Sequence, residues 1–298
     1  MTAAIQSETG LPGLPSASGI EIVGPTAYVV ADDAPFLYAL DAATLAPTGR
    51  IPLFETAGFA GGRLPKATKP DLEALAACTW PGRGPGLLLL GSGSAPLRHC
   101  GYWVPLPPVP GGAPPPEALH LGALYAAARA ALPPGALLNI EAAATTATEL
   151  LLLQRGVGAG AAAVVLRLPL AAALAHLAGQ GPAPTPAAQR FGLPAVDGCP
   201  AGFSGAMFLE GRLWVTASVE NTADPVRDGA VLGSFVGVLD LATGTADFAR
   251  LAWADGRAYR GKVEGLAQRR PLPGGRQELL LVTDDDQGGS TALVVEVG

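Results

Sequence analysis

Short apolar runs recur along the whole chain, and turn-forming residues separate them. The most apolar runs are AYVVA, GLLLLG, ELLLLQ, LWVTAS and ELLLVT, and a polar loop follows each of them. A shorter strand pattern with one polar residue precedes each run. A further apolar strand pattern follows each loop, and a more polar segment closes most repeats. Runs of this length between Gly, Pro and Asp turns predict an all-β protein built from many short strands.

The polar residue of the first strand pattern marks the repeat. It is Glu21 in GIEIVG, Glu73 in DLEALA, Glu141 in NIEAAA, Ser204 in GFSGAM and Glu264 in KVEGLA. These positions are spaced roughly 50 to 70 residues apart, which indicates a repeat architecture. Four antiparallel strands per repeat correspond to one blade of a β-propeller.

The strand count predicts how the ring closes. Five sets of the first three strands are present, but the last set ends at Gly298 without a fourth strand. We expect residues 3–9 to supply that strand beside residues 293–297, because an unpaired edge would otherwise remain. Residues 1–298 are therefore predicted to form a single domain, a propeller of five four-stranded blades. A sixth blade within the long second and third repeats is the alternative to reading ALYAAARAALPPG and LPLAAALAHLAGQG as helical insertions.

Strand direction places the marker residues together. Neighbouring strands are antiparallel, so the first strands begin on the face where the second strands end. Several carboxylates at one channel mouth must become protonated, pair with cations or bind a metal. Glu73, Glu141 and Glu264 are the candidate catalytic carboxylates. Ca²⁺ is the cofactor expected here, because it prefers oxygen ligands such as Glu21, Asp284 and Asp285. Alternatively, each glutamate accepts backbone N–H groups and locks the ring.

Basic and polar side chains are also expected on the face that carries the channel mouth. All the lysines, Lys66, Lys69 and Lys262, precede first strands. The candidate ligand-binding residues are Lys69, Arg98, Arg155, Glu220, Asn221 and Lys262. Local ion pairs, or a solvated loop for residues 220–229, are the alternatives. Lys262 and Glu264 lie two apart on a strand, so we expect their side chains to meet on the channel side.

Composition narrows the possible partners and compartment. The chain is 49% hydrophobic and 15% charged, with mean hydropathy +0.33, net charge -6 and pI near 5.1. These values exclude disorder and argue against nucleic acid as a partner. Arg167, Pro169 and His176 interrupt the longest apolar stretch, so we expect no membrane span. Three scattered cysteines favour a reducing compartment, and we expect a cytoplasmic protein with a small molecule or another protein at the channel mouth.

The repeat segments taken together resemble a known group of proteins. KPDLEALA, LLLLGSGSAPLR, LNIEAAA, ENTADPVRDGAVLGSFVGVLD and KVEGLA look like an uncharacterised bacterial β-propeller family, a domain of unknown function. That family is distantly similar to phytase-like and esterase-like propellers. The resemblance implies the propeller fold and, through those relatives, calcium with phosphoester or ester chemistry. Two hypotheses follow: a Ca²⁺-dependent hydrolase of phosphoesters, esters or lactones, or a non-catalytic propeller that binds a small ligand or a protein.

Overall fold

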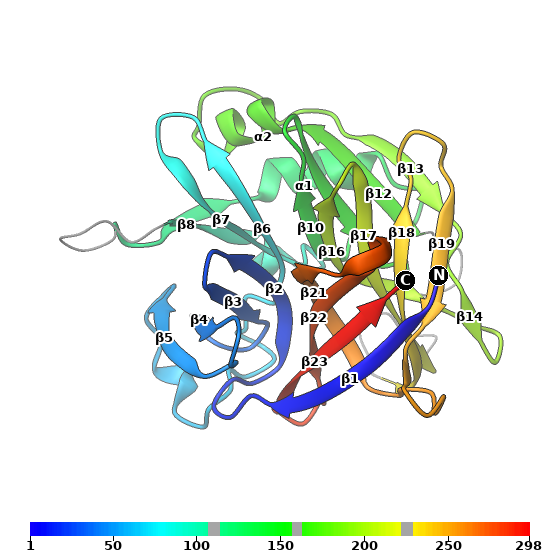
Figure 1. Cartoon of the computed structure of the whole chain (residues 1–298). Coiled ribbons are helices and arrows are strands. Elements are labelled where there is room, and N and C mark those ends of the chain that lie inside the picture. Colours follow the sequence, from blue (N-terminus) through cyan, green and yellow to red (C-terminus); the bar gives the residue numbers. More distant parts are fainter. Residues whose placement is uncertain (107–113, 157–162, 222–228) are drawn as a thin grey trace.

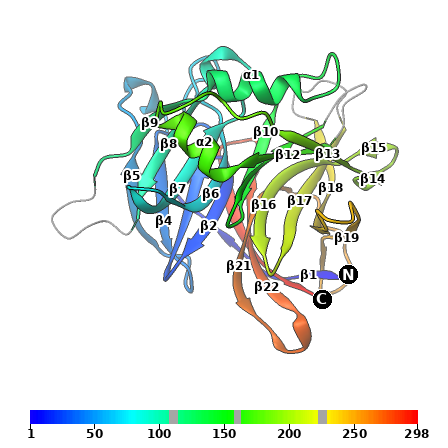
Figure 2. The same ribbon diagram turned by 90° about the horizontal axis from the view of Figure 1, so that it is seen from above.

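The chain forms a ring of five antiparallel sheets around a central axis (Figure 1). The computed structural model describes residues 1–106, 114–156, 163–221 and 229–298. Each sheet is a propeller blade whose first strand lies nearest the axis, and Figure 2 shows the same blades after a turn of 90°. The predicted five-bladed, all-β architecture is confirmed, and the six-bladed alternative is wrong.

The blades follow one another in chain order. Blade 1 comprises β2 (Ala17–Val23), β3 (Thr26–Ala31), β4 (Phe36–Asp41) and β5 (Pro47–Pro52). Blade 2 comprises β6 (Leu72–Trp80), β7 (Gly84–Gly91), β8 (Cys100–Pro105) and β9 (Glu117–His120). Blade 3 comprises β10 (Ile140–Thr145), β11 (Glu149–Gln154), β12 (Ala163–Pro169) and β13 (Ala187–Phe191). Blade 4 comprises β16 (Gly202–Leu209), β17 (Arg212–Asn221), β18 (Ala230–Leu239) and β19 (Ala246–Arg250).

The fifth blade closes the ring with both ends of the chain. Its strands are β21 (Lys262–Pro271), β22 (Gln277–Asp284), β23 (Ser290–Val297) and β1 (Ala3–Gly10). The N-terminal β1 pairs antiparallel with β23, from Ala3 opposite Val297 to Gly10 opposite Thr291. The short β20 (Ala252–Trp253) adds to the outer side of β1. The predicted closure is therefore confirmed, because β1 supplies the strand that the C-terminal repeat lacks.

The insertions lie where the Ala-rich segments predicted helices. Helix α1 (Gly122–Ala130) joins blade 2 to blade 3, and α2 (Leu170–Leu177) follows β12. A hairpin of β14 (Ala195–Val196) and β15 (Cys199–Pro200) joins blade 3 to blade 4. The 3₁₀ turns are η1 (Ala57–Phe59), η2 (Pro96–Arg98) and η3 (Pro273–Gly275). No helix in the described part of the chain has the length and apolar character needed to cross a membrane.

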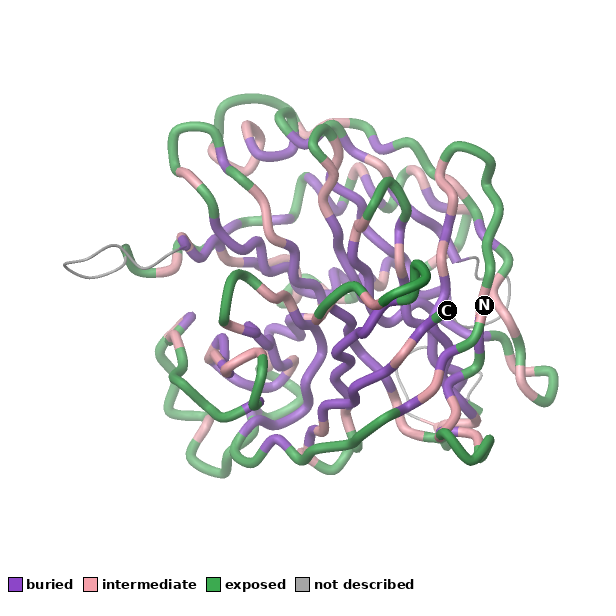
Figure 3. The backbone as a smooth tube through the Cα atoms, viewed as in Figure 1, coloured by how far each residue is buried: buried purple, intermediate pink, exposed green. Residues whose placement is uncertain are grey.

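Apolar side chains between neighbouring blades form the core. One cluster joins blades 2 and 3 with α1 and α2, and another joins blades 3 and 4. Blade 5 packs against blade 1 on one side and against blade 4 on the other. Figure 3 shows this buried interior, with exposed turns around the periphery. Packing on both faces of every sheet explains why the second strands read as continuous apolar runs.

Small residues let the inner strands approach one another at the axis. A Cβ on Gly205 would lie 2.8 Å from Gly265 Cα, and one on Gly265 would lie 3.1 Å from Gly19 Cα. These contacts are with backbone atoms, so a side chain at these positions would force the blades apart.

Candidate ligand site at the channel mouth

Every inner strand carries a β-bulge near its start, and the bulged residue is polar. The pairing between first and second strands shifts at the same point in each blade. The bulged residues, called the axial residues below, are Ser18, Glu73, Glu141, Ser204 and Glu264. A bulge breaks the ladder locally and re-aims one side chain, so an apolar strand can turn a carboxylate toward the axis.

Glu21 does not share this position, and its placement in the predicted ring was wrong. Glu21 lies three residues after Ser18, opposite Tyr28, and its Oε1 accepts the Ala77 N–H at 3.1 Å. Burial raises the pKa of Glu21 to about 7, while the Ala77 hydrogen bond lowers it. The missed signal was a polar residue followed directly by Gly or Ala. That signal reads Ser-Gly at 18–19 and 204–205, Glu-Ala at 73–74 and 141–142, and Glu-Gly at 264–265.

A small cavity lies among the axial carboxylates. Ser18, Glu73, Glu141 and Glu264 line it, together with small residues of the inner strands. It offers about 10 Å³ for the centres of water-sized molecules, which is room for about one. The structure therefore brings the three predicted catalytic glutamates around one small cavity.

Glu141 is held by a buried ion pair. Arg155 Nη1 lies 2.7 Å from Glu141 Oε2, and Asn139 Nδ2 donates to Glu141 Oε1 at 2.5 Å. The second arm of Arg155 reaches Glu220 Oε1 at 2.5 Å. Burial lowers the pKa of Arg155, but the charges of Glu141 and Glu220 outweigh it, so the guanidinium stays protonated. Arg155 thus links blades 3 and 4 and leaves Glu141 little capacity for a ligand.

Lys262 binds several carboxylates on the blade 5 side. Its Nζ lies 3.1 Å from Glu264 Oε1, 3.3 Å from Asp286 Oδ1 and 3.6 Å from Glu220 Oε1. The expected contact between Lys262 and Glu264 is confirmed. Burial raises the pKa of Glu264 to about 8, against the lowering effect of Lys262 and Arg155. Nearby cations thus stabilise the charge of Glu264 in an apolar strand, but they do not offset the whole cost of burying that charge.

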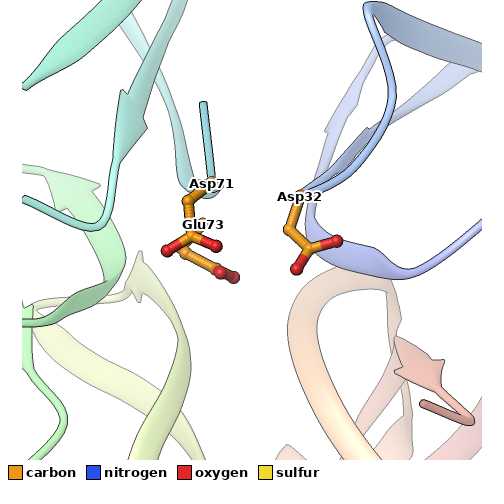
Figure 4. Close-up of side chains that lie close together, drawn as sticks. All are labelled: Asp32, Asp71 and Glu73. Carbon is orange, nitrogen blue, oxygen red and sulfur yellow. The ribbon is translucent and has the colours of Figure 1, made fainter. Parts of the chain in front are cut away.

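Asp32, Asp71 and Glu73 form an acidic cluster on the opposite side of the mouth. Each offers one carboxylate oxygen, and these oxygens all lie within 4.8 Å of one another. Figure 4 shows Asp32 facing Asp71 and Glu73 across the gap between two blades. This donor set has the all-oxygen character and spacing that suit a hard cation such as Ca²⁺.

Lys69 competes with a metal for that cluster. Its Nζ bonds Asp32 Oδ2 and lies 3.0 Å from Asp71 Oδ1. Burial lowers the pKa of Lys69, but the carboxylates of the cluster outweigh it, so Lys69 remains an ammonium. Asp32 nevertheless keeps one buried oxygen, Oδ1, without a hydrogen-bond partner. The donors therefore fit a hard cation, which would have to displace the ammonium or share the cluster with it.

Glu73 belongs to both the cluster and the axial cavity. No hydrogen bond or ion pair joins its carboxylate to another residue in the described ranges. Burial raises the pKa of Glu73 well above its usual range, the negative charges of Asp71, Glu141 and Asp32 add to the rise, and the charge of Lys69 opposes it. Glu73 is thus the axial carboxylate that is free to hold a proton or a cation.

The other predicted residues have mainly local partners. Arg98 Nη1 contacts Asp71 Oδ2 at 2.7 Å, while Asn221 is exposed and accepts from Cys199. Asp285 Oδ1 accepts backbone N–H groups of its own turn. Asp284 lies nearer the mouth, where burial raises its pKa to about 6. The remaining loop candidates, residues 222–228, lie outside the described residues.

Comparison with known proteins places the chain in a family. The chain belongs to DUF6929, a family of unknown function whose model matches residues 13–297. None of the curated protein sequences matches it. Among solved structures it is similar to Myxococcus xanthus glutaminyl cyclase, with TM-score 0.51 and 13% identity over 100% of this chain and 97% of that one. The WD40 domain of Neurospora crassa Pan2 gives TM-score 0.42 and 8% identity over 99% and 95%. These likenesses concern the fold alone.

Proposed function

For this member of a family of unknown function, we propose that the channel mouth binds a small cationic ligand and that Glu73 pairs with it. The proposal rests on which axial carboxylates already have a cationic neighbour. Glu141 and Glu264 have cationic neighbours within 3.1 Å, whereas no hydrogen bond or ion pair joins Glu73 to a described residue and Lys69 acts on it only through its charge. Glu73 is half-buried and faces other carboxylates, so a ligand that supplies a positive charge there gains affinity.

The charge balance of the mouth supports a cation over an anion. The cationic side chains Lys69, Arg98, Arg155 and Lys262 each contact at least one carboxylate already. A phosphate would have to break these ion pairs and would meet the carboxylates they neutralise. The basic residues proposed from sequence as ligand contacts therefore act here as counter-ions of the acidic residues.

A thermal-shift screen with Glu73→Gln tests the proposal. The wild-type protein should gain melting temperature with a cation from a panel of Ca²⁺, Mg²⁺ and simple alkylammonium ions at constant ionic strength, because a ligand that binds the folded state stabilises it. Glu73→Gln keeps the shape, removes the charge and should lose that gain. Glu149→Gln is the matched control, since Glu149 pairs with Arg167 on the surface of blade 3, away from the axis. A panel without any shift, or a shift that survives Glu73→Gln, refutes the proposal.

A metal-dependent hydrolase is the second candidate. The observation in its favour is the spacing of Asp32, Asp71 and Glu73, whose oxygens could jointly contact one ion. A divalent cation there would polarise an ester or phosphoester, and a glutamate would serve as base. Metal analysis of the purified protein, followed by p-nitrophenyl acetate and p-nitrophenyl phosphate assays with Ca²⁺ and with a chelator, tests this candidate. Hydrolysis that the chelator does not change would rule out the metal.

A further inference from the structure

The axial cavity presents a buried oxygen that no hydrogen bond satisfies. Glu264 is 3% exposed and lines the cavity. Its Oε1 has no hydrogen-bond partner. Lys262 Nζ lies 3.1 Å away but outside the directions of a hydrogen bond, so it supplies charge without satisfying the acceptor. Glu73 lines the same cavity, is half-buried and has no hydrogen bond to a described residue, although the charge of Lys69 acts on it.

The size of the cavity limits what can enter it. Space for about one water-sized group admits a monatomic ion, a water molecule or the –NH₃⁺ head of a larger molecule. Bulkier cations such as a quaternary ammonium do not fit. The cavity holds only about one such group, so the rest of a larger ligand has to lie outside it, in the channel mouth.

Oxygen spacing separates a metal ion from an ammonium. Ca²⁺ holds its oxygens at 2.3–2.6 Å and needs several of them close together. Among the described residues the carboxylates spaced for one ion are Asp32, Asp71 and Glu73, and the set of Glu73, Glu141 and Glu264 does not meet that spacing. An ammonium donates three directed hydrogen bonds at longer N···O distances of about 2.7–2.9 Å. An ammonium needs only two or three acceptors and no closed shell of oxygens, so a cavity with few free acceptors suits it better than a small metal ion.

We propose that the axial cavity receives the primary ammonium head of a small amine, held between Glu73 and Glu264. This inference rests on the proposed function and names the class of its ligand. The ammonium donates to the carboxylate of Glu73 and to Glu264 Oε1, the two acceptors without a hydrogen bond. Glu141 takes no part, because Arg155 and Asn139 already engage both of its oxygens.

The test compares ammonium ions of different shape with the full-length chain. The probes are ethylammonium, tetramethylammonium and Ca²⁺, at one pH near neutrality and constant ionic strength. Ethylammonium should raise the melting temperature by roughly 1–3 °C at about ten times its dissociation constant. Tetramethylammonium has no N–H donor and exceeds the cavity, so it should give no shift. Glu73→Gln and Glu264→Gln should each abolish the ethylammonium shift, and Glu149→Gln should retain it.

The outcomes separate this inference from the proposed function. If Ca²⁺ binds through Glu73 and ethylammonium does not, the mouth is a cation site but the inference is wrong. Equal shifts with ethylammonium and tetramethylammonium, or a shift that survives Glu264→Gln, also overturn it. If no cation of either kind binds, the proposed function itself fails. Should Glu264→Gln not fold, calorimetric titration of the wild-type protein with the two ammonium ions decides the question by the same comparison.

Discussion

The clearest test of the structure away from the mouth is Glu21→Gln. Glu21 lies inside β2, and its Oε1 accepts the Ala77 N–H of the neighbouring blade. Burial raises the pKa of Glu21 from 4.5 to about 7. Since the folded state holds the proton more tightly than the unfolded chain, the resulting stability is fully present below about pH 4.5 and is lost as pH rises through about 7. Gln keeps an acceptor for Ala77 and does not titrate.

The magnitude follows from the size of the shift. A rise of about 2.5 pKa units corresponds to about 3 kcal/mol between the two protonation states, which is an upper estimate for a partly buried group. Between pH 4.5 and pH 8, the unfolding free energy of Glu21→Gln should therefore rise relative to that of the wild type by up to about 3 kcal/mol. The nearby Cys78 thiol, whose pKa burial raises to about 11, stays neutral throughout and does not confuse the comparison.

Urea unfolding at several pH values measures that difference. Both proteins are followed by fluorescence at pH 5, 6, 7 and 8, and the two free energies are subtracted at each pH. The subtraction cancels the other titrating groups, which the two proteins share. A difference that is flat with pH would refute the argument, because it would mean that Glu21 ionises as easily in the folded chain as in water.

The remaining predictions concern the axis and its ion pairs. Arg155→Met should lower the unfolding free energy by about 3–5 kcal/mol in urea, because it leaves Glu141 without a cation and Glu220 with only the more distant Lys262, whereas the surface variant Arg167→Met should cost less than about 1 kcal/mol. Gly265→Ala should cost about 1–3 kcal/mol by the same assay, because its Cβ would meet backbone atoms of blade 1 at about 3.0 Å. Lys69→Met should make the protein gain melting temperature with Ca²⁺, since it removes the ammonium that competes for Asp32 and Asp71; an unchanged response would show that the cluster does not take the ion.

The fold could be predicted from the chain because its signals are local and repeated. Apolar runs, Gly/Pro turns and the missing fourth strand of the last repeat gave the blade count and the closure by β1. The contact of Lys262 with Glu264 was predicted from their two-residue spacing, and it forms even though Glu264 is the bulged residue. The position of Glu21 was not, because a β-bulge shifts the alternation by one residue and period-two reasoning cannot locate it. The cluster of Asp32 with Asp71 joins loops of two different blades, so no local pattern reveals it.

The axial position shows how a structural repeat can become a chemical site. All five inner strands need a bulge there, and all five place a small residue directly after it so that the strands can meet at the axis. A serine satisfies this geometry at no electrostatic cost, as Ser18 does by donating to Leu72 O at 2.5 Å. A buried carboxylate in the same place needs a cation, which Arg155 and Lys262 provide for Glu141 and Glu264. Closing the ring therefore does not require Glu73, whose nearest cation, Lys69, is bound to Asp32 and Asp71 instead. A half-buried carboxyl group that the architecture does not need points to a ligand, and Glu73 is the residue at which to look for it.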